Sequence, residues 1–390
     1  MDGKGMQESS LKRLDWLDAL RGWAIFAVVI VHCGQVAHSD GLIKKLTETG
    51  QYGVQLFFVV SALTISLTYN SHREKYGSSA RANLGWLIKR FFRIAPIYYL
   101  AIIFYSLESY AFFVASHHAY GAVPQEIPLL SNIFFVHAWV PSGNNSVVPG
   151  GWSIGVEMFF YLLVPLIWMV SPKWRVWLLF AGVFAGIGAT LLAAQISTGT
   201  FDVDNNSFLY CWFPTQAPVF ALGLLFFMHR GHKLGRNLGA YEGVCYVVAA
   251  ILFILAGIYL GTWSKVAPVL APTVVGVAFL FVVASIGGWA RRILVNRPAI
   301  FLGKISYSVY ILHFAVLDVI RVAEYKIATP HHGEVPIVPI IAGVVTVTCC
   351  LASLSKRYVE YPGIRVGAKL CNTLVASGVN RTAIAEGSPS

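Results

Sequence analysis

The chain has 390 residues, of which 56% are hydrophobic and 12% charged, with a formal net charge of +11 at pH 7 and a mean hydropathy of +0.65. Soluble proteins carry about one quarter charged residues, so this composition excludes an ordinary soluble enzyme. Apolar runs recur from residue 16 to residue 355 with short connections, which predicts one polytopic membrane domain.

Runs of about 20 apolar residues predict an all-α bundle of about ten transmembrane helices. We expect a cytoplasmic N-terminal segment (1–13), a transmembrane domain (14–365) and a cytoplasmic, disordered tail (366–390). A cleaved signal peptide is the alternative for the first run, but no small-residue cleavage site follows it. The predicted spans are 16–36, 53–70, 93–115, 152–170, 175–195, 211–228, 241–261, 266–287, 299–320 and 335–355.

The basic residues predict the orientation of the spans. If the connections alternate between the two sides, most Lys and Arg residues fall on the side of the two termini. The positive-inside rule therefore places both termini in the cytoplasm. The net positive charge is then a topology signal and requires no nucleic-acid partner. The other side receives only Lys44, Lys45, Lys265, Arg321 and Lys326.

The first apolar run, residues 14–35, carries Arg21 and His32 eleven residues apart. At about 100° per residue, the two side chains share one helix face about 16 Å apart. Ionisable groups inside a membrane are costly and usually mark a functional path. This polar line indicates either a catalytic site or the anion or proton path of a transporter.

Two further groups could complete a site. Alternate threading places His32 and Glu157 about 6 and 7 Å below the outer face, which suits a general base oriented by a carboxylate. Arg90 and Arg93 are three residues apart at the cytoplasmic mouth of the third span, where guanidinium groups, with Arg21, could bind phosphate. The alternatives are structural: polar pairs that fix helix packing, and ordinary positive-inside anchoring.

Other signals are weaker. The outer connection 116–151 contains an apolar patch, 129–140, that is too short to span and predicts a re-entrant or interfacial segment. His313 and Asp318 have the H-x4-D spacing of soluble glycerolipid acyltransferases, but five helical steps put them about 140° apart. The cysteines and the pairs His117-His118 and His331-His332 lack metal-ligand spacing, so no metal is expected.

Several motifs in chain order resemble one family. Arg21-Gly22 followed by His32 is similar to the R-x10-H signature of the membrane-bound acyltransferase-3 family, which includes the O-acetyltransferases of bacterial surface polysaccharides. GVQLFFVVSALTIS (53–66) resembles the family's GVDLFFVLSGFLI, and Arg90 with Arg93 resembles its R-x-x-R. Further similar segments, which extend the resemblance to about residue 365, are WSIGVEMFFYLLVP (152–165), LGKISYSVYILHF (302–314) and YVEYP (358–362).

The resemblance implies transfer of an acyl group, most often acetyl, from cytoplasmic acyl-coenzyme A to a hydroxyl of a glycan or lipid-linked glycan. The chain would be a multi-pass protein of the bacterial inner membrane, with no permanently bound cofactor and with homo-oligomers possible. Arg21, Arg90 and Arg93 would bind the donor's phosphates. His32 would take the proton from the acceptor hydroxyl, directly or through a relay, and Glu157 would orient it; a covalent acyl-enzyme route stays open.

The resemblance also suggests residues that line a cavity, and the sequence departs from the family pattern at several positions. Gln55 stands where the family usually has an acid, Ala62 replaces a usual glycine, and Met158 and Phe159 replace a polar pair. The acceptor side is therefore expected to differ from that of other members. No hydrolase-like extracytoplasmic domain is expected in this chain, so a partner enzyme would be separate. Candidates to line the acceptor cavity are Ser61, Trp152, Ser153, Tyr310 and His313.

Overall fold

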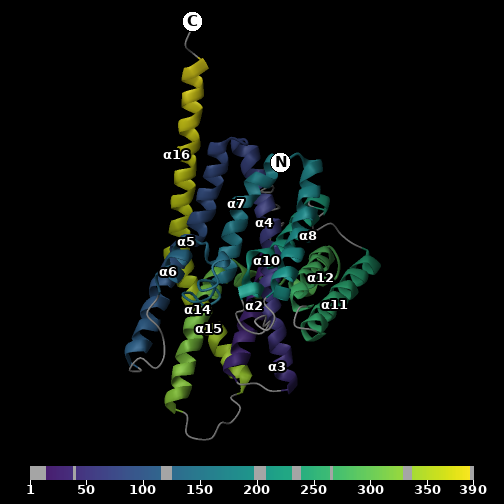
Figure 1. Cartoon of the computed structure of the whole chain (residues 1–390), viewed down its shortest axis with the longest axis vertical. Helices are drawn as coiled ribbons and strands as arrows, with labels where there is room; N and C mark the ends of the chain where they lie inside the picture. Colours follow the sequence, from purple (N-terminus) through teal and green to yellow (C-terminus); the bar gives the residue numbers. More distant parts are fainter. Residues whose placement is uncertain are drawn as a thin grey trace. The chain divides into compact units, whose positions relative to one another are not determined.

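The computed structural model describes residues 15–37, 41–115, 125–196, 208–230, 239–263, 267–327 and 336–386 (Figure 1). Within these ranges the regular structure is helical and contains no strand. Nine helices of the described chain are long and apolar enough to cross a membrane. The predicted class, an all-α polytopic membrane protein, is confirmed, while the orientation of the termini stays a prediction.

The chain forms two compact units, residues 1–63 with 176–353, and residues 64–175 with 354–390. Three helices run from one unit into the other: α4 (Gly53–Tyr76), α8 (Pro172–Ile196) and α15 (Ile337–Ser355). The first unit also contains α2 (Asp15–Val36), α3 (Gly41–Glu48), η1 (Thr49–Tyr52), α9 (Phe208–Cys211), α10 (Phe213–Arg230), α11 (Ala240–Trp263), η4 (Ala267–Leu270), α12 (Ala271–Ser285), α13 (Ala290–Leu294) and α14 (Arg297–Ile327). The second contains α5 (Ala80–Ala115), α6 (Glu126–Ile133), η2 (His137–Trp139), α7 (Trp152–Met169), the π-helical turn η5 (Lys356–Glu360) and α16 (Tyr361–Glu386).

The backbones of α2 and α14 touch in the first unit. A Cβ atom at Gly22 would lie 1.9 Å from the carbonyl oxygen of Ala299, and one at Gly303 would lie 1.7 Å from that of Asp18. Only glycine permits so close an approach at these two positions. Ten residues beyond these glycines, His32 and His313 also meet, with ring centroids 5.4 Å apart. The two helices therefore run parallel, as the alternation of the predicted spans requires.

Three helix boundaries differ from the sequence-based prediction. α5 begins at Ala80, well before residue 93, because a helix continues beyond its apolar run. α12 has 15 residues, about 22 Å, and is shorter than the predicted span 266–287; it starts next to Pro272, which lies in its first turn, where proline needs no backbone N–H. α16 continues through the segment predicted as a disordered tail and packs along α5 (Figure 1). Cys371 of α16 is fully buried and faces Gly85 of α5, so packing on α5 stabilises the helix at the beginning of this segment.

Buried polar groups of the second unit stabilise the described part of the connection between α5 and α7, residues 125–151. α6 and η2 are too short to span a membrane, as predicted. The Tyr98 hydroxyl donates to Oδ1 of Asn132 at 2.6 Å, and the Asn132 amide donates to the carbonyl of Gly143 at 3.0 Å. Nε2–H of the fully buried His137 donates to the carbonyl of Gly151 at 2.8 Å. Burial lowers the pKa of His137, so at neutral pH it acts as an uncharged hydrogen-bonding group.

Several features of the sequence lie outside the described residues. They are the N-terminal segment 1–13 and the two histidine pairs at 117–118 and 331–332.

The contact at Gly22 gives a test of the α2–α14 packing. We expect Gly22→Ala to lower the stability of the protein by about 1–3 kcal/mol or more, because the new methyl group overlaps a backbone carbonyl. The measurement is the thermal unfolding midpoint of the detergent-solubilised protein. Gly182→Ala is the control: no atom lies within 4 Å of its added Cβ, and alanine in a helix is favoured by up to about 1 kcal/mol. Equal midpoints for the two variants would contradict the packing.

Candidate active site

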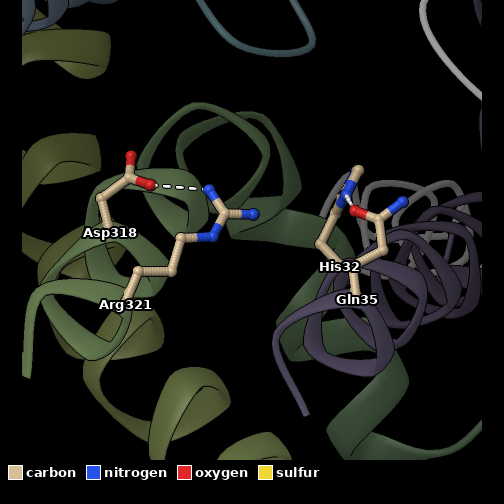
Figure 2. A network of polar contacts seen from close by, with 4 residues as sticks. All are labelled: His32, Gln35, Asp318 and Arg321. Carbon is tan, nitrogen blue, oxygen red and sulfur yellow. Dashed lines mark hydrogen bonds and ion pairs between the residues drawn. The ribbon is translucent and has the colours of Figure 1, made fainter. Parts of the chain in front are cut away.

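His32 has a fixed tautomer in α2. Its Nδ1–H donates to Oε1 of Gln35, one helical turn further, at 2.9 Å (Figure 2). Nε2 therefore carries the lone pair, and no hydrogen bond to it occurs among the described residues. The side chain is partly exposed. A neutral imidazole with an oriented ring and an accessible lone pair is what a general base requires.

His313 of α14 lies beside His32. Phe314 packs against both imidazoles, with ring centroids 4.5 Å from His32 and 4.1 Å from His313. His313 is fully buried, and its Nδ1–H donates to the carbonyl of Val309 at 3.1 Å. The family resemblance made this histidine one of several candidates to line the acceptor cavity, and the structure places it next to the predicted base.

Asp318 does not form a catalytic pair with His313. Its Oδ1 accepts a hydrogen bond from Nη1 of Arg321 at 2.7 Å (Figure 2). The hydrogen bond of His313 goes instead to Val309 within its own helix. The weaker interpretation, a soluble-type H-x4-D motif, is therefore wrong for this chain. Arg321 is close enough to interact electrostatically with His32.

Three other candidates, Tyr310, Ser61 and Arg21, also belong to the first unit. The Tyr310 ring centroid lies 6.0 Å from that of His313 and 6.1 Å from that of Phe57. Ser61 is buried on α4. Arg21 forms an ion pair with Asp18 at 3.6 Å, and its side chain is 15% exposed.

Gln55 and Ala62, two departures from the family pattern, have structural explanations in the first unit. Nε2 of Gln55 donates to Oε1 of Gln216 at 3.0 Å and to the hydroxyl of Tyr210 at 3.2 Å. Gln216 in turn donates to the carbonyl of Tyr210 at 2.6 Å. The amide at position 55 thus fits a fully buried, neutral network. Ala62 faces Gly223 of α10, where little space is left.

Glu157 and the arginine pair come together in the second unit. Oε1 of Glu157 accepts a hydrogen bond from the Tyr161 hydroxyl at 2.7 Å. Cζ of Arg90 lies 5.7 Å from the Tyr161 ring centroid, and Arg93 also interacts electrostatically with Tyr161. Tyr161 is one turn from Glu157, so the arginines and the carboxylate lie close together. The depths inferred from the sequence put them at opposite ends of the helices, and that prediction is wrong. The error came from placing the third span at residue 93 instead of Ala80.

Arg90 is the buried member of its pair. It donates to Oγ1 of Thr68, and its guanidinium lies 5.3 Å from the ring centroid of Trp86. Arg93 is exposed. The two arginines, three residues apart in one helix, thus differ in their surroundings. Nε1 of Trp86 is buried and has no hydrogen-bond partner among the described residues.

The remaining second-unit candidates belong to the start of α7. Trp152 and Ser153 are both buried, and the Ser153 hydroxyl donates to the carbonyl of Gly150 at 3.2 Å. This hydroxyl therefore stabilises the turn that begins the helix. His32 and Glu157 belong to different units, so their predicted pairing stays a prediction. No cluster in the described part of the chain has three His, Cys, Asp or Glu residues that could hold a metal ion.

Sequence reasoning missed three polar partners that helical spacing could have identified. Gln35 lies three residues after His32, Tyr161 four after Glu157, and Arg321 three after Asp318. Side chains at these spacings are neighbours on a helix surface. Trp86, four residues before Arg90 in α5, carried the same signal. Thr68 did not, because its contact with Arg90 joins two helices, α4 and α5.

Comparison with known proteins gives one family. A family model described as an acyltransferase domain matches residues 14–354. A protein of Staphylococcus aureus named "Putative O-acetyltransferase" is 23% identical over 93% of this chain and 59% of its own length. A "Putative membrane-bound transacylase", BcsY of Komagataeibacter xylinus, is 25% identical over 89% of this chain and 82% of its own. The peptidoglycan O-acetyltransferase OatA of Listeria monocytogenes is 23% identical over 90% of this chain and 56% of its own.

The chain thus spans little more than half the length of the staphylococcal and listerial relatives. No solved structure matches it significantly.

The hydrogen-bond network at Gln55 predicts that an acid at this position, which is usual in the family, lowers the stability of this protein. We expect Gln55→Glu to lower stability by about 1–3 kcal/mol, because a carboxyl group would face the oxygen of Gln216 in a fully buried site. Thermal unfolding in detergent measures this. Gln51→Glu, the same change at a partly exposed position, should shift stability by no more than about 0.5 kcal/mol. A Gln55→Glu protein as stable as wild type would rule out the neutral network.

Proposed function

Because this chain belongs to the acyltransferase-3 family, we propose that it is a membrane O-acyltransferase that moves an acyl group, acetyl in the first instance, from acyl-coenzyme A to a glycan hydroxyl. The observation that carries the proposal is His32, which occupies the histidine position of R-x10-H and whose tautomer is fixed by Gln35. The proposed site of action is the bacterial inner membrane; the apolar helices support a multi-pass membrane protein.

His32 performs the proton chemistry. Its Nε2 lone pair takes the proton of the acceptor hydroxyl while the hydroxyl oxygen bonds to the acyl carbon. The carbon–sulfur bond breaks, and the proton passes from the imidazolium to the coenzyme A sulfur, which leaves as free thiol. Gln35 keeps Nδ1 protonated throughout, so the ring presents the same nitrogen in each cycle. Glu157, the predicted orienting acid, would stabilise the charged imidazolium.

The arginines of the second unit bind the donor's phosphates in this proposal. Arg93 is exposed and available to an anion, and Arg90 holds a second positive charge one turn away. The unpartnered Nε1–H of Trp86, beside Arg90, is a donor that a phosphate oxygen could satisfy. Arg21 is the third predicted contact and comes from the first unit. Coenzyme A is a substrate here and not a resident cofactor.

The acceptor is proposed to be a glycan or lipid-linked glycan. The listerial relative is named for O-acetylation of peptidoglycan, which supports this class of acceptor. No role for nucleic acid is needed, since the positive charge is explained by membrane topology. The alternative class is a transporter, in which Arg21 and His32 would line an ion path.

The central test is acyl transfer by purified protein in liposomes. We expect wild type with acetyl-coenzyme A and a glycan fraction from the producing cell to release free thiol and acetylate the glycan. His32→Ala should reduce the rate at least about 100-fold, as is typical when a general base is removed. His229→Ala, at an exposed histidine of α10, is the control and should keep the wild-type rate. Normal transfer by His32→Ala would disprove the mechanism, and ion uptake without thiol release would favour the transporter.

The donor site has a test of its own. Arg93→Gln should weaken coenzyme A binding about tenfold, because it removes one charged hydrogen bond to phosphate. Arg81→Gln removes the same charge from another exposed position of α5 and should leave the affinity unchanged. Calorimetry on the solubilised protein gives both values. Equal affinities for the two variants would remove Arg93 from the site.

A further inference from the structure

His313 contains an unsatisfied hydrogen-bond acceptor. Its Nδ1–H donates to the carbonyl of Val309, so its Nε2 carries a lone pair. This atom is buried, in a side chain that is 0% exposed, and no donor reaches it among the described residues. Buried polar atoms are almost always hydrogen-bonded, so an exception calls for a functional explanation.

The neighbouring rings do not supply the missing donor. Phe314, the nearest at 4.1 Å between centroids, has no polar hydrogen. His32, at 5.4 Å, gives its only N–H to Gln35. An apolar side chain in place of His313 would fill the same space without a buried lone pair. The imidazole is therefore better explained by a donor that arrives with a ligand.

The His313 ring lies beside that of His32, so a ligand that reacts at His32 is the nearest candidate to supply the donor. We propose that Nε2 of His313 accepts a hydrogen bond from an O–H or N–H group of the bound substrate, close to the atom that reacts at His32. The inference rests on the proposed acyl transfer. Because the two imidazoles are adjacent, the substrate must carry this second donor within a few bonds of its reacting centre.

Two parts of the reaction complex carry such a donor. One is the acceptor, where the donor is a hydroxyl or amide on the carbon next to the reacting hydroxyl, as in a sugar. The other is the amide N–H of the acyl-coenzyme A arm nearest the thioester. The chemistry at His313 is the same in both cases. His313 is thus a positioning residue that favours substrates with this second donor.

The experiment compares substrate pairs that differ in one donor, using liposome-reconstituted protein and thiol release. The acceptor pair is methyl glucoside and its single-deoxy analogues, with acetyl-coenzyme A. The donor pair is S-acetyl-N-acetylcysteamine and its ester analogue, which lacks the N–H, with the glycan fraction as acceptor. We expect wild type to prefer the complete member of one pair by about 10- to 100-fold in kcat/KM. The pair that shows the preference identifies the source of the donor.

His313→Phe should reduce that preference to about twofold or less, while His313→Gln, whose carbonyl is again an acceptor, should retain most of it. A ratio of kcat/KM values is independent of the folded fraction, so a purely structural role would not change it. His313→Leu repeats the test if the Phe variant does not fold. Phe314→Leu is the matched control, since it alters the packing of the same ring and leaves the lone pair; its ratio should equal that of wild type.

The outcomes separate the two proposals. If wild type transfers acyl groups but His313→Phe and His313→Leu keep the full preference, or wild type has none in either pair, the inference about His313 is wrong and acyl transfer stands. If wild type releases no thiol with any acceptor, the proposed function fails, and this inference fails with it.

Discussion

The direct backbone contact between α2 and α14 is the constraint on which the histidine site depends. At Gly22 and Gly303, a carbonyl group of the other helix lies where a side chain would begin. From this contact the two parallel helices rise about 15 Å over ten residues, which brings His32 and His313 to one level. The glycine that follows Arg21 is therefore a packing residue, and it determines which side chain lies beside His32.

The polar groups of the two units differ in their partners. In the first, His32 and Gln55 each form a hydrogen bond with a neutral amide, of Gln35 and Gln216 respectively. In the second, a buried guanidinium, Arg90, contacts aromatic rings and a hydroxyl, and Tyr161 links this group to Glu157. These contacts hold a buried positive charge and a carboxylate close together in one unit. In the proposed acyl transfer, the first unit would supply the base and the second the groups that bind the donor.

Much of the fold followed from local sequence patterns. Apolar runs located the membrane helices, and the alternation of spans agrees with the parallel packing of α2 and α14. Boundaries were less well predicted, because α5 and α16 extend into polar sequence and are stabilised there by packing on each other. Because α5 starts at Ala80, Arg90 is a buried residue within this helix and does not lie at its start, where the sequence placed it.

The sequence by itself determined the membrane class, the family resemblance, and the shared face of Arg21 and His32, because these depend on composition, ordered motifs and helical periodicity within one segment. Only the tertiary structure decided that His313 is the neighbour of His32, that Asp318 pairs with Arg321, and that Glu157 joins the arginine pair through Tyr161. Contacts between distant helices depend on how closely and in which register the helices pack. That register is established by small residues and side-chain volumes across the whole interface, which periodicity along one segment does not specify.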